Sequence, residues 1–172
     1  DVYKRQETNI SKDAEIQDLS EQRLIRRKKL EDLRNAGRDP YIHETYDIDA
    51  YSKEIKDRFE EFDGKELSLS GRLMTKRVMG KASFCDIQDR DGRLQIYVRR
   101  DDIGQEDYKW FKTYDIGDII GVRGKVFKTK TGEISIHAEK IDLLCKSLQV
   151  LPDKWSGLQD TDLRYRPVSY TH

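Results

Sequence analysis

The spacing of apolar residues changes at Lys65, and this change constrains the fold more than any other feature of the sequence. Before Lys65, apolar residues recur with the period of one face of an α-helix, which predicts a helix over residues 49–62 with a core-facing stripe of Tyr51, Ile55, Phe59 and Phe62. After Lys65, apolar and polar residues alternate, as in half-buried strands. The chain is therefore expected to be helical before this point and mainly β-sheet after it.

The alternating segments and the turn residues between them predict the order of the strands. Leu67, Leu69 and Leu73 alternate with polar residues in the first strand, where Gly71 indicates a bulge or a tight bend. The other predicted elements are strands over residues 83–89, 93–99, 118–128 and 133–144, and a short helix over residues 105–114. Three strands, a short helix and two strands is the order of a five-stranded OB-fold barrel. An SH3-like barrel rarely places a helix at that position. The predicted fold is mainly β with flanking helices, and two N-terminal helices precede the barrel.

The first of these N-terminal helices is strongly basic. Asp18 and Glu21 have the spacing of a capping box, and Gly37 followed by Pro40 is a stop signal. Leu30 and Leu33 are its clearest apolar residues, and its other positions are crowded with Arg23, Arg26, Arg27, Lys28, Lys29 and Arg34. The basic face is either a solvated surface or a phosphate-binding one, and the sequence leaves both open.

Charge is balanced in total but unevenly distributed. Residues 20–38 carry seven Lys and Arg against three Asp and Glu, whereas residues 39–64 carry three against nine. Such blocks favour a polyanionic partner on particular faces. Cys85 and Cys145 lack the number and spacing of a disulfide framework or a metal site and are expected to be reduced. With no apolar run of membrane-spanning length and no signal-peptide pattern, the expected location is the cytoplasm, away from membranes.

Phe84 is the most informative residue for function. Alternation places Cys85 and Ile87 inside the barrel and Phe84 outside, close to the outward amide of Gln95 on the next strand. Residues 76–82 and 128–133 are predicted to form flanking loops that carry the cations Lys76, Arg77, Lys81 and Lys130. An exposed ring, a polar amide and cationic loops match what single-stranded RNA requires. The alternative is that the first helix or the C-terminal tail covers Phe84.

Catalytic and metal-binding patterns are not evident. His43, His137 and His172 have no partner at a useful spacing, and no glycine-rich phosphate-binding loop is present. Hairpin turns and strand ends commonly use aspartate, so no metal site is predicted from Asp86, Asp89, Asp91, Asp101 and Asp102. Neither a metal nor another cofactor is expected in this chain.

Several motifs together resemble the class II lysyl-tRNA synthetases of bacterial type. They are MGKASF at residues 79–84, KTKTGEISIHA at residues 128–138, and LPDKW followed by RYR at residues 151–155 and 164–166. The resemblance covers residues 20–166. It implies that Phe84 stacks on the central anticodon uridine, that Gln95 and Arg77 hydrogen-bond anticodon bases, and that Glu133 lies near the first anticodon position.

The same resemblance predicts the partner and the domains. The partner is the anticodon loop of the tRNA for lysine. The full-length enzyme is expected to be a homodimer that uses ATP and Mg²⁺ to attach lysine to its tRNA. This chain departs from the family pattern after Arg166 and is expected to bind RNA without catalysis. The predicted divisions are a disordered segment over residues 1–19 (1–6 non-native), a helical extension over 20–64, an anticodon-binding OB-fold over 65–150, a linker over 151–166 and a non-native tail over 167–172.

Three rival interpretations remain open. Aspartyl- and asparaginyl-tRNA synthetases carry a related N-terminal OB-fold with a similarly placed aromatic residue and glutamine. The chain could also be a free-standing OB module for single-stranded nucleic acids, or a barrel that docks a protein partner through Phe84.

Overall fold

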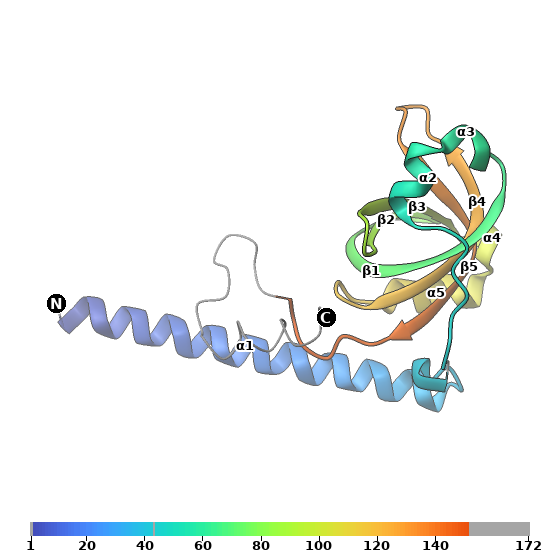
Figure 1. Cartoon of the computed structure of the whole chain (residues 1–172). Helices are drawn as coiled ribbons and strands as arrows, with labels where there is room; N and C mark the ends of the chain where they lie inside the picture. Colours follow the sequence, from blue (N-terminus) through green and yellow to red (C-terminus); the bar gives the residue numbers. More distant parts are fainter. Residues whose placement is uncertain (1, 43, 152–172) are drawn as a thin grey trace.

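A long helix precedes a small barrel in the computed structural model, which describes residues 2–42 and 44–151, with side chains from residue 17 on. The barrel contains five strands and a helical segment between the third and the fourth (Figure 1). In chain order the elements are α1 (Val2–Asn35), η1 (Pro40–Ile42), α2 (Ser52–Asp57), α3 (Phe59–Phe62), β1 (Glu66–Met79), β2 (Ala82–Gln88), β3 (Arg93–Arg99), α4 (Arg100–Ile103), α5 (Gln105–Thr113), β4 (Ile119–Lys128) and β5 (Ile134–Cys145).

The strands close into a barrel in the order β1-β2-β3-β5-β4. All neighbouring pairs are antiparallel except β3 and β5, which run parallel. The parallel pair arises because α4 and α5 carry the chain from the end of β3 across to β4. This topology confirms the predicted OB-fold, and the boundaries of β3 match the predicted strand.

The alternation of side chains explains the core. Every second residue of β2 and β3 is buried, and the opposite face of each strand is half-exposed. The inward residues of these two strands are Ser83, Cys85, Ile87, Leu94, Ile96 and Val98. Burial raises the pKa of the Cys85 thiol to about 12, so the thiol stays protonated and unreactive near neutral pH. Tyr108, Phe111 and Tyr114 join the same core from α5 and the residue after it.

Strand β1 is long because it serves two partners. It pairs with β4 through residues 66–72 and with β2 from Arg72 to Met79. The register shift lies between Leu73 and Thr75, which confirms the irregularity predicted for this strand but places it just after Gly71. A Cβ atom at Gly71 would lie 2.8 Å from the carbonyl oxygen of Gln88, so close backbone packing requires glycine there.

The N-terminal helices differ from prediction in two respects. Helix α1 begins at Val2 rather than near Asp18, where the sequence predicted a capping box. The physical reason is that residues 2–35 contain neither glycine nor proline, so nothing interrupts the helix. The helix predicted over residues 49–62 is two short helices that meet at Arg58.

The start of α2 is set by contacts with the barrel. The backbone of Asp49 hydrogen-bonds the carbonyl oxygen of Ser68 on β1, so the chain is still extended there. Helix α2 then begins at Ser52, whose backbone N–H and hydroxyl donate to the carboxylate of Asp89 at 2.6 and 2.7 Å. Asp89 therefore acts as a cap supplied from the β2–β3 hairpin. The linker and tail predicted over residues 152–172 lie outside the described residues.

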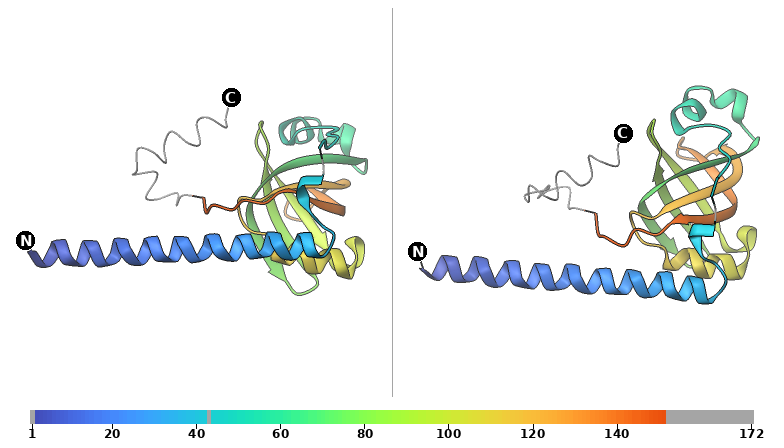
Figure 2. Two further views of the ribbon diagram at one scale, coloured as in Figure 1. Left: turned by 90° about the horizontal axis from the view of Figure 1, so that it is seen from below. Right: turned by 60° about the horizontal axis from the view of Figure 1, so that its bottom comes forward.

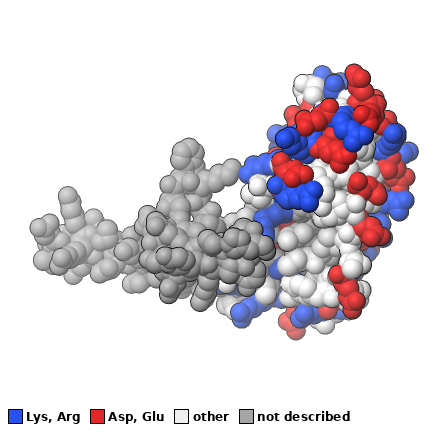
Figure 3. All heavy atoms as spheres, in the orientation of Figure 1, with Lys and Arg blue, Asp and Glu red and all other residues white. Residues whose placement is uncertain are grey.

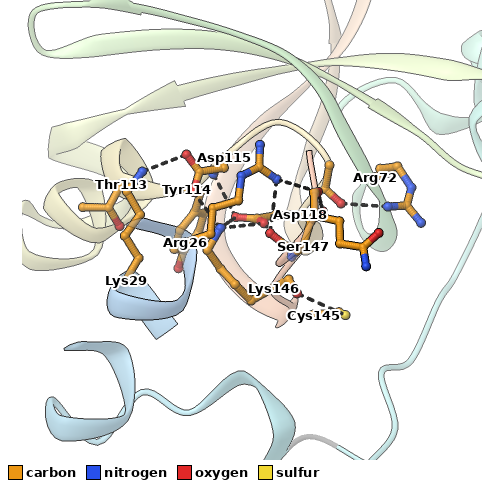
Figure 4. A network of polar contacts seen from close by, with 12 residues as sticks. Arg26, Lys29, Arg72, Thr113, Tyr114, Asp115, Asp118, Cys145, Lys146 and Ser147 are labelled. Carbon is orange, nitrogen blue, oxygen red and sulfur yellow. Dashed lines mark hydrogen bonds and ion pairs between the residues drawn. The ribbon is translucent and has the colours of Figure 1, made fainter. Parts of the chain in front are cut away.

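A polar network attaches the last turns of α1 to one end of the barrel (Figure 4). Lys146 Nζ lies 2.8 Å from Asp118 Oδ1 and 2.7 Å from Asp115 Oδ2. From α1, Lys29 reaches Asp115 at 2.7 Å, and Arg26 donates to the carbonyl oxygens of Ser147 and Gln149. Burial raises the pKa of Asp115, but hydrogen bonds from Lys146 and Lys29 outweigh it and hold that pKa below its usual value. Leu30 and Leu33, the clearest apolar residues of this helix, are buried.

Candidate nucleic-acid interface

The outer surface of the barrel carries two adjacent rows of polar and aromatic side chains. In the first row, Phe84 of β2 pairs with Arg77 of β1 and with Tyr97 of β3, and Tyr97 pairs with His137 of β5. In the second row, Asp86 pairs with Thr75 and Gln95, and Gln95 pairs with Ser135. Directly paired side chains on one face of a sheet lie within contact distance, so each row is a continuous strip across four strands.

Phe84 lies on the outer face, half-buried, as alternation predicted. Its ring packs against that of Tyr97 with centroids 4.9 Å apart. The sequence left open whether the first helix covers Phe84. The described polar contacts of α1 with the barrel are at the barrel end near Asp115 and Ser147. Phe84, Arg77 and Gln95 line one hollow of about 350 Å³, together with Thr75, Lys76, Cys85 and Asp86. The sequence-predicted ring, guanidinium and amide therefore converge on one surface.

A second, more apolar hollow of about 300 Å³ adjoins the first and shares Phe84 with it. Its other lining residues are Met79, Ala82, Tyr97, Phe127, Thr129 and Lys130. Lys130 thus lies beside this hollow, as expected for a cation of the flanking loop. The aromatic surface continues to His137, whose Nε2 lies 2.5 Å from Asp102 Oδ2.

The loop between β4 and β5 carries the predicted glutamate. The turn closes with a hydrogen bond from Gly132 to the carbonyl of Thr129, and Gly132 has a φ of 90°, which favours glycine. Glu133 follows, exposed, with Oε1 3.8 Å from the ammonium of Lys56 on α2. Lys81 is exposed in the tight β1–β2 turn. Lys81 and Glu133 flank the two hollows rather than line them.

Lys76 lies on a strand and not in the predicted flanking loop. Residues 76–79 continue β1 instead of forming a loop, and Lys76 pairs with the inward residue Cys85. Its ammonium donates to the carbonyl oxygens of Lys112 and Tyr114, at 2.9 Å to the first. Burial accordingly lowers the pKa of Lys76. The Lys76 ammonium thus bonds the end of α5, while the residue also lines the hollow that contains Phe84. Its contact with RNA stays a prediction.

Sequence reasoning did not select five residues that the barrel brings to this surface: Asp86, Tyr97, Phe127, Ser135 and His137. Alternation had placed most of them outside, so their parity was available as a signal. Alternation along one strand does not predict which side chains lie next to these residues on the neighbouring strands. Ser135 illustrates this, because it is fully buried although it belongs to the outer row.

Charge on the rest of the molecule is mixed. Acidic and basic side chains are interspersed over the end of the barrel that carries α2 and α3 (Figure 3). Helix α1 projects well beyond the barrel (Figure 2). On its last turns Arg26 and Lys29 are engaged by the barrel, whereas Arg23, Arg27 and Lys28 are exposed.

The described residues offer neither a membrane-spanning helix nor a cluster of metal ligands. Among residues 2–42 and 44–151, none of the helices has both the length and the apolar composition needed to span a bilayer. The same part of the chain contains no group of three or more His, Cys, Asp or Glu side chains placed to hold a metal ion.

Comparison with known proteins agrees with this geometry. Residues 67–144 match the family model for the tRNA anti-codon type of OB-fold nucleic acid binding domain. A protein named lysine–tRNA ligase from Thermoanaerobacter sp. (strain X514) is 55% identical over 150 residues, which is 87% of this chain and 30% of the relative. Proteins of the same name are 53% identical over 81% of the chain in Clostridium botulinum (strain Langeland) and 48% over 94% in Clostridium perfringens (strain SM101).

The chain spans about 30% of the length of these curated relatives. The family match runs through all five strands, from Leu67 of β1 to Leu144 of β5, and so includes both rows of the outer surface. Residues 67–144 therefore match the tRNA anti-codon type of OB-fold nucleic acid binding domain, and most of the chain is similar in sequence to proteins named lysine–tRNA ligase.

Proposed function

We propose that the outer surface of β1, β2 and β3 binds the anticodon loop of a tRNA, and that this is the tRNA for lysine. The observation that carries the proposal is the convergence of Phe84, Arg77 and Gln95 on one hollow of about 350 Å³. The names of the relatives support the choice of lysine over aspartate or asparagine.

Each of these residues has a distinct chemical role in the proposal. The half-exposed ring of Phe84 stacks on an unpaired base, an interaction that tolerates any base because every base has a π-face. The amide of Gln95 and the guanidinium of Arg77 hydrogen-bond base edges, which differ between bases. Glu133, Lys81 and Lys130 flank this hollow and contact the neighbouring nucleotides and phosphates.

For the full-length protein we propose the activity that the relatives' name describes, attachment of lysine to its tRNA. This activity would use ATP and Mg²⁺, in the cytoplasm and as a homodimer. The described residues fit neither group, because they offer no metal-ligand cluster and the sequence has no glycine-rich phosphate loop. We therefore assign none of the described residues to ATP or Mg²⁺. The proposed division assigns residues 65–150 to anticodon binding and residues 20–64 to a helical extension.

Replacing Phe84 with alanine should weaken binding of a lysine anticodon stem-loop by about 1–3 kcal/mol, the usual cost of losing one stacked base. Stability should change little, because the ring lies outside the core. Binding is measured by fluorescence anisotropy at one salt concentration, and stability by thermal unfolding. Tyr41→Ala removes a more exposed ring at η1, away from the hollow, and should leave binding unchanged. A large fall in melting temperature for Phe84→Ala would show that the ring belongs to the core.

Neutralising Arg27 and Lys28 tests whether α1 contacts tRNA phosphates. These two side chains are exposed on the last turns of the helix. Each phosphate contact that is lost should flatten the slope of log affinity against log salt by about 0.7–0.9. The control removes the same charge at Lys109 and Lys140, exposed on α5 and β5, and should leave the slope unchanged. An unaltered slope for Arg27→Gln with Lys28→Gln would make α1 a merely solvated surface.

A stem-loop with the aspartate anticodon separates the rival interpretations. Tighter binding of the aspartate loop would favour an aspartyl- or asparaginyl-type domain. Equal binding of both loops would favour an OB module for any single strand. Binding of neither, with no dependence on salt, would leave the protein-docking barrel.

A further inference from the structure

Ser135 is a buried polar residue beside the proposed base-reading amide. It lies on β5, directly paired with Gln95 on the parallel strand β3. Its side chain is fully buried, whereas Gln95 is half-exposed at the hollow. The Ser135 hydroxyl donates to Gln95 Oε1 at 2.9 Å. Two neighbouring residues of the outer row are thus linked by one partly buried hydrogen bond.

This hydrogen bond determines which end of the Gln95 amide faces the solvent. A buried hydroxyl must donate its hydrogen to an acceptor, and within the described residues Gln95 Oε1 is the acceptor that the Ser135 hydroxyl contacts. An amide rotated by 180° would offer Ser135 an N–H group and leave the hydroxyl hydrogen without a partner. The carbonyl oxygen of Gln95 therefore faces Ser135, and both N–H donors of Nε2 remain for a ligand.

Asp86 makes this restraint necessary. It is the direct partner of Gln95 on β2, on the side opposite to Ser135. Its carboxylate accepts a hydrogen bond from the Thr75 hydroxyl at 2.8 Å and has further acceptor capacity. A Gln95 amide released from Ser135 could turn its N–H groups towards this carboxylate. Those donors would then be unavailable to a base.

We propose that Ser135 is a positioning residue for base recognition. Its hydroxyl holds the carbonyl oxygen of Gln95, so that the Gln95 amide presents only hydrogen-bond donors to the RNA. This inference rests on the proposed function. A donor-only edge selects a base with a carbonyl oxygen at the facing position, such as O4 of uracil. It rejects cytosine, which has an amino group there. Ser135 therefore contributes to the choice between uridine and cytidine without touching either base.

The test compares two stem-loops that differ only in the central anticodon base, uridine or cytidine, with the purified chain at one salt concentration. Ser135→Ala should lower the uridine-to-cytidine preference about five- to tenfold, the cost of one misplaced hydrogen bond. Ser135→Thr keeps the hydroxyl and should keep the preference. In a Gln95→Ala background, Ser135→Ala should change nothing further, because it acts through that amide.

The outcomes are separable. The positioning role is overturned if Ser135→Ala leaves the uridine-to-cytidine preference unchanged. It is also overturned if Ser135→Ala lowers that preference equally in the wild-type and Gln95→Ala backgrounds. Should the alanine variant unfold in a thermal melt, Ser135→Cys replaces it, since a thiol is a weak donor of similar volume and predicts a loss in the same direction. A wild-type chain that binds neither stem-loop, or both equally, sinks the proposed function instead. If Gln95→Ala lowers the uridine preference of the wild-type chain but Ser135→Ala does not, only this inference is contradicted.

Discussion

Replacing Lys146 with methionine should lower the free energy of unfolding by about 3–5 kcal/mol, the usual cost of removing one member of a buried ion pair. The Lys146 side chain is 1% exposed and that of Asp118 is 0% exposed. Methionine fills a similar volume, so the loss is electrostatic and not due to a cavity. Without the ammonium, the buried carboxylate of Asp118 keeps, among the described residues, its hydrogen bonds from the backbone N–H groups of Asp115 and Ser147.

The measurement is urea unfolding followed by circular dichroism near neutral pH. Lys140→Met is the matched control, because Lys140 pairs with Asp142 at 3.7 Å but is 64% exposed, and an exposed pair contributes about 0–1 kcal/mol. Adding Asp118→Asn to Lys146→Met should recover part of the loss, since no unpaired charge then remains at that position. A loss below about 1 kcal/mol for Lys146→Met would mean that water reaches the site in solution.

Replacing Gln95 with glutamate should reverse the base preference at the proposed anticodon site. A carboxylate only accepts hydrogen bonds. With one oxygen held by Ser135, its other oxygen faces the base, where it attracts the amino group of cytosine and repels O4 of uracil. The difference in binding free energy between the uridine and cytidine stem-loops should shift by about 2–3 kcal/mol towards cytidine, as expected for hydrogen bonds to charged groups.

Measuring both stem-loops with each variant cancels the general effect of an added negative charge. Gln95→Ala is the control, since it removes the donors without adding an acceptor. It should narrow the uridine preference by about 1–3 kcal/mol without reversing it. Equal losses on both RNAs would mean that Gln95 only supports the surface. Little loss on either RNA would place the anticodon elsewhere on the barrel.

The faces of the strands were predictable because they depend on local geometry. Side chains alternate along any strand, so a single segment was enough to place Phe84 and Gln95 outside and Cys85 inside. The turn residues Asp91-Gly92 and Gly132 likewise carried their own signal. These local rules were sufficient for the OB-fold and for the outward placement of Phe84 and Gln95.

The loop predicted at Lys76 is a strand, because the length of a strand depends on its pairing with a neighbouring strand. Residues 76–79 look like a cationic loop, but β2 continues the hydrogen-bonded ladder opposite them and turns Lys76 inward. Arg26 and Lys29 were indistinguishable by sequence from Arg27 and Lys28. Only the packing of α1 against Asp115 and Ser147 shows that Arg26 and Lys29 contact the barrel, whereas Arg27 and Lys28 are exposed.

The sequence by itself determined the order of the strands and the outward ring of Phe84, since each follows from periods and turns within short segments, and the strand order in turn predicted an OB-fold. The tertiary structure decided how Gln95 is oriented, which cations are exposed and how Lys146 is buried. Those features depend on contacts such as Gln95 with Ser135 and Lys146 with Asp118, which join residues 40 and 28 positions apart. No local period encodes a contact at that separation, because it forms only when the strands close into the barrel.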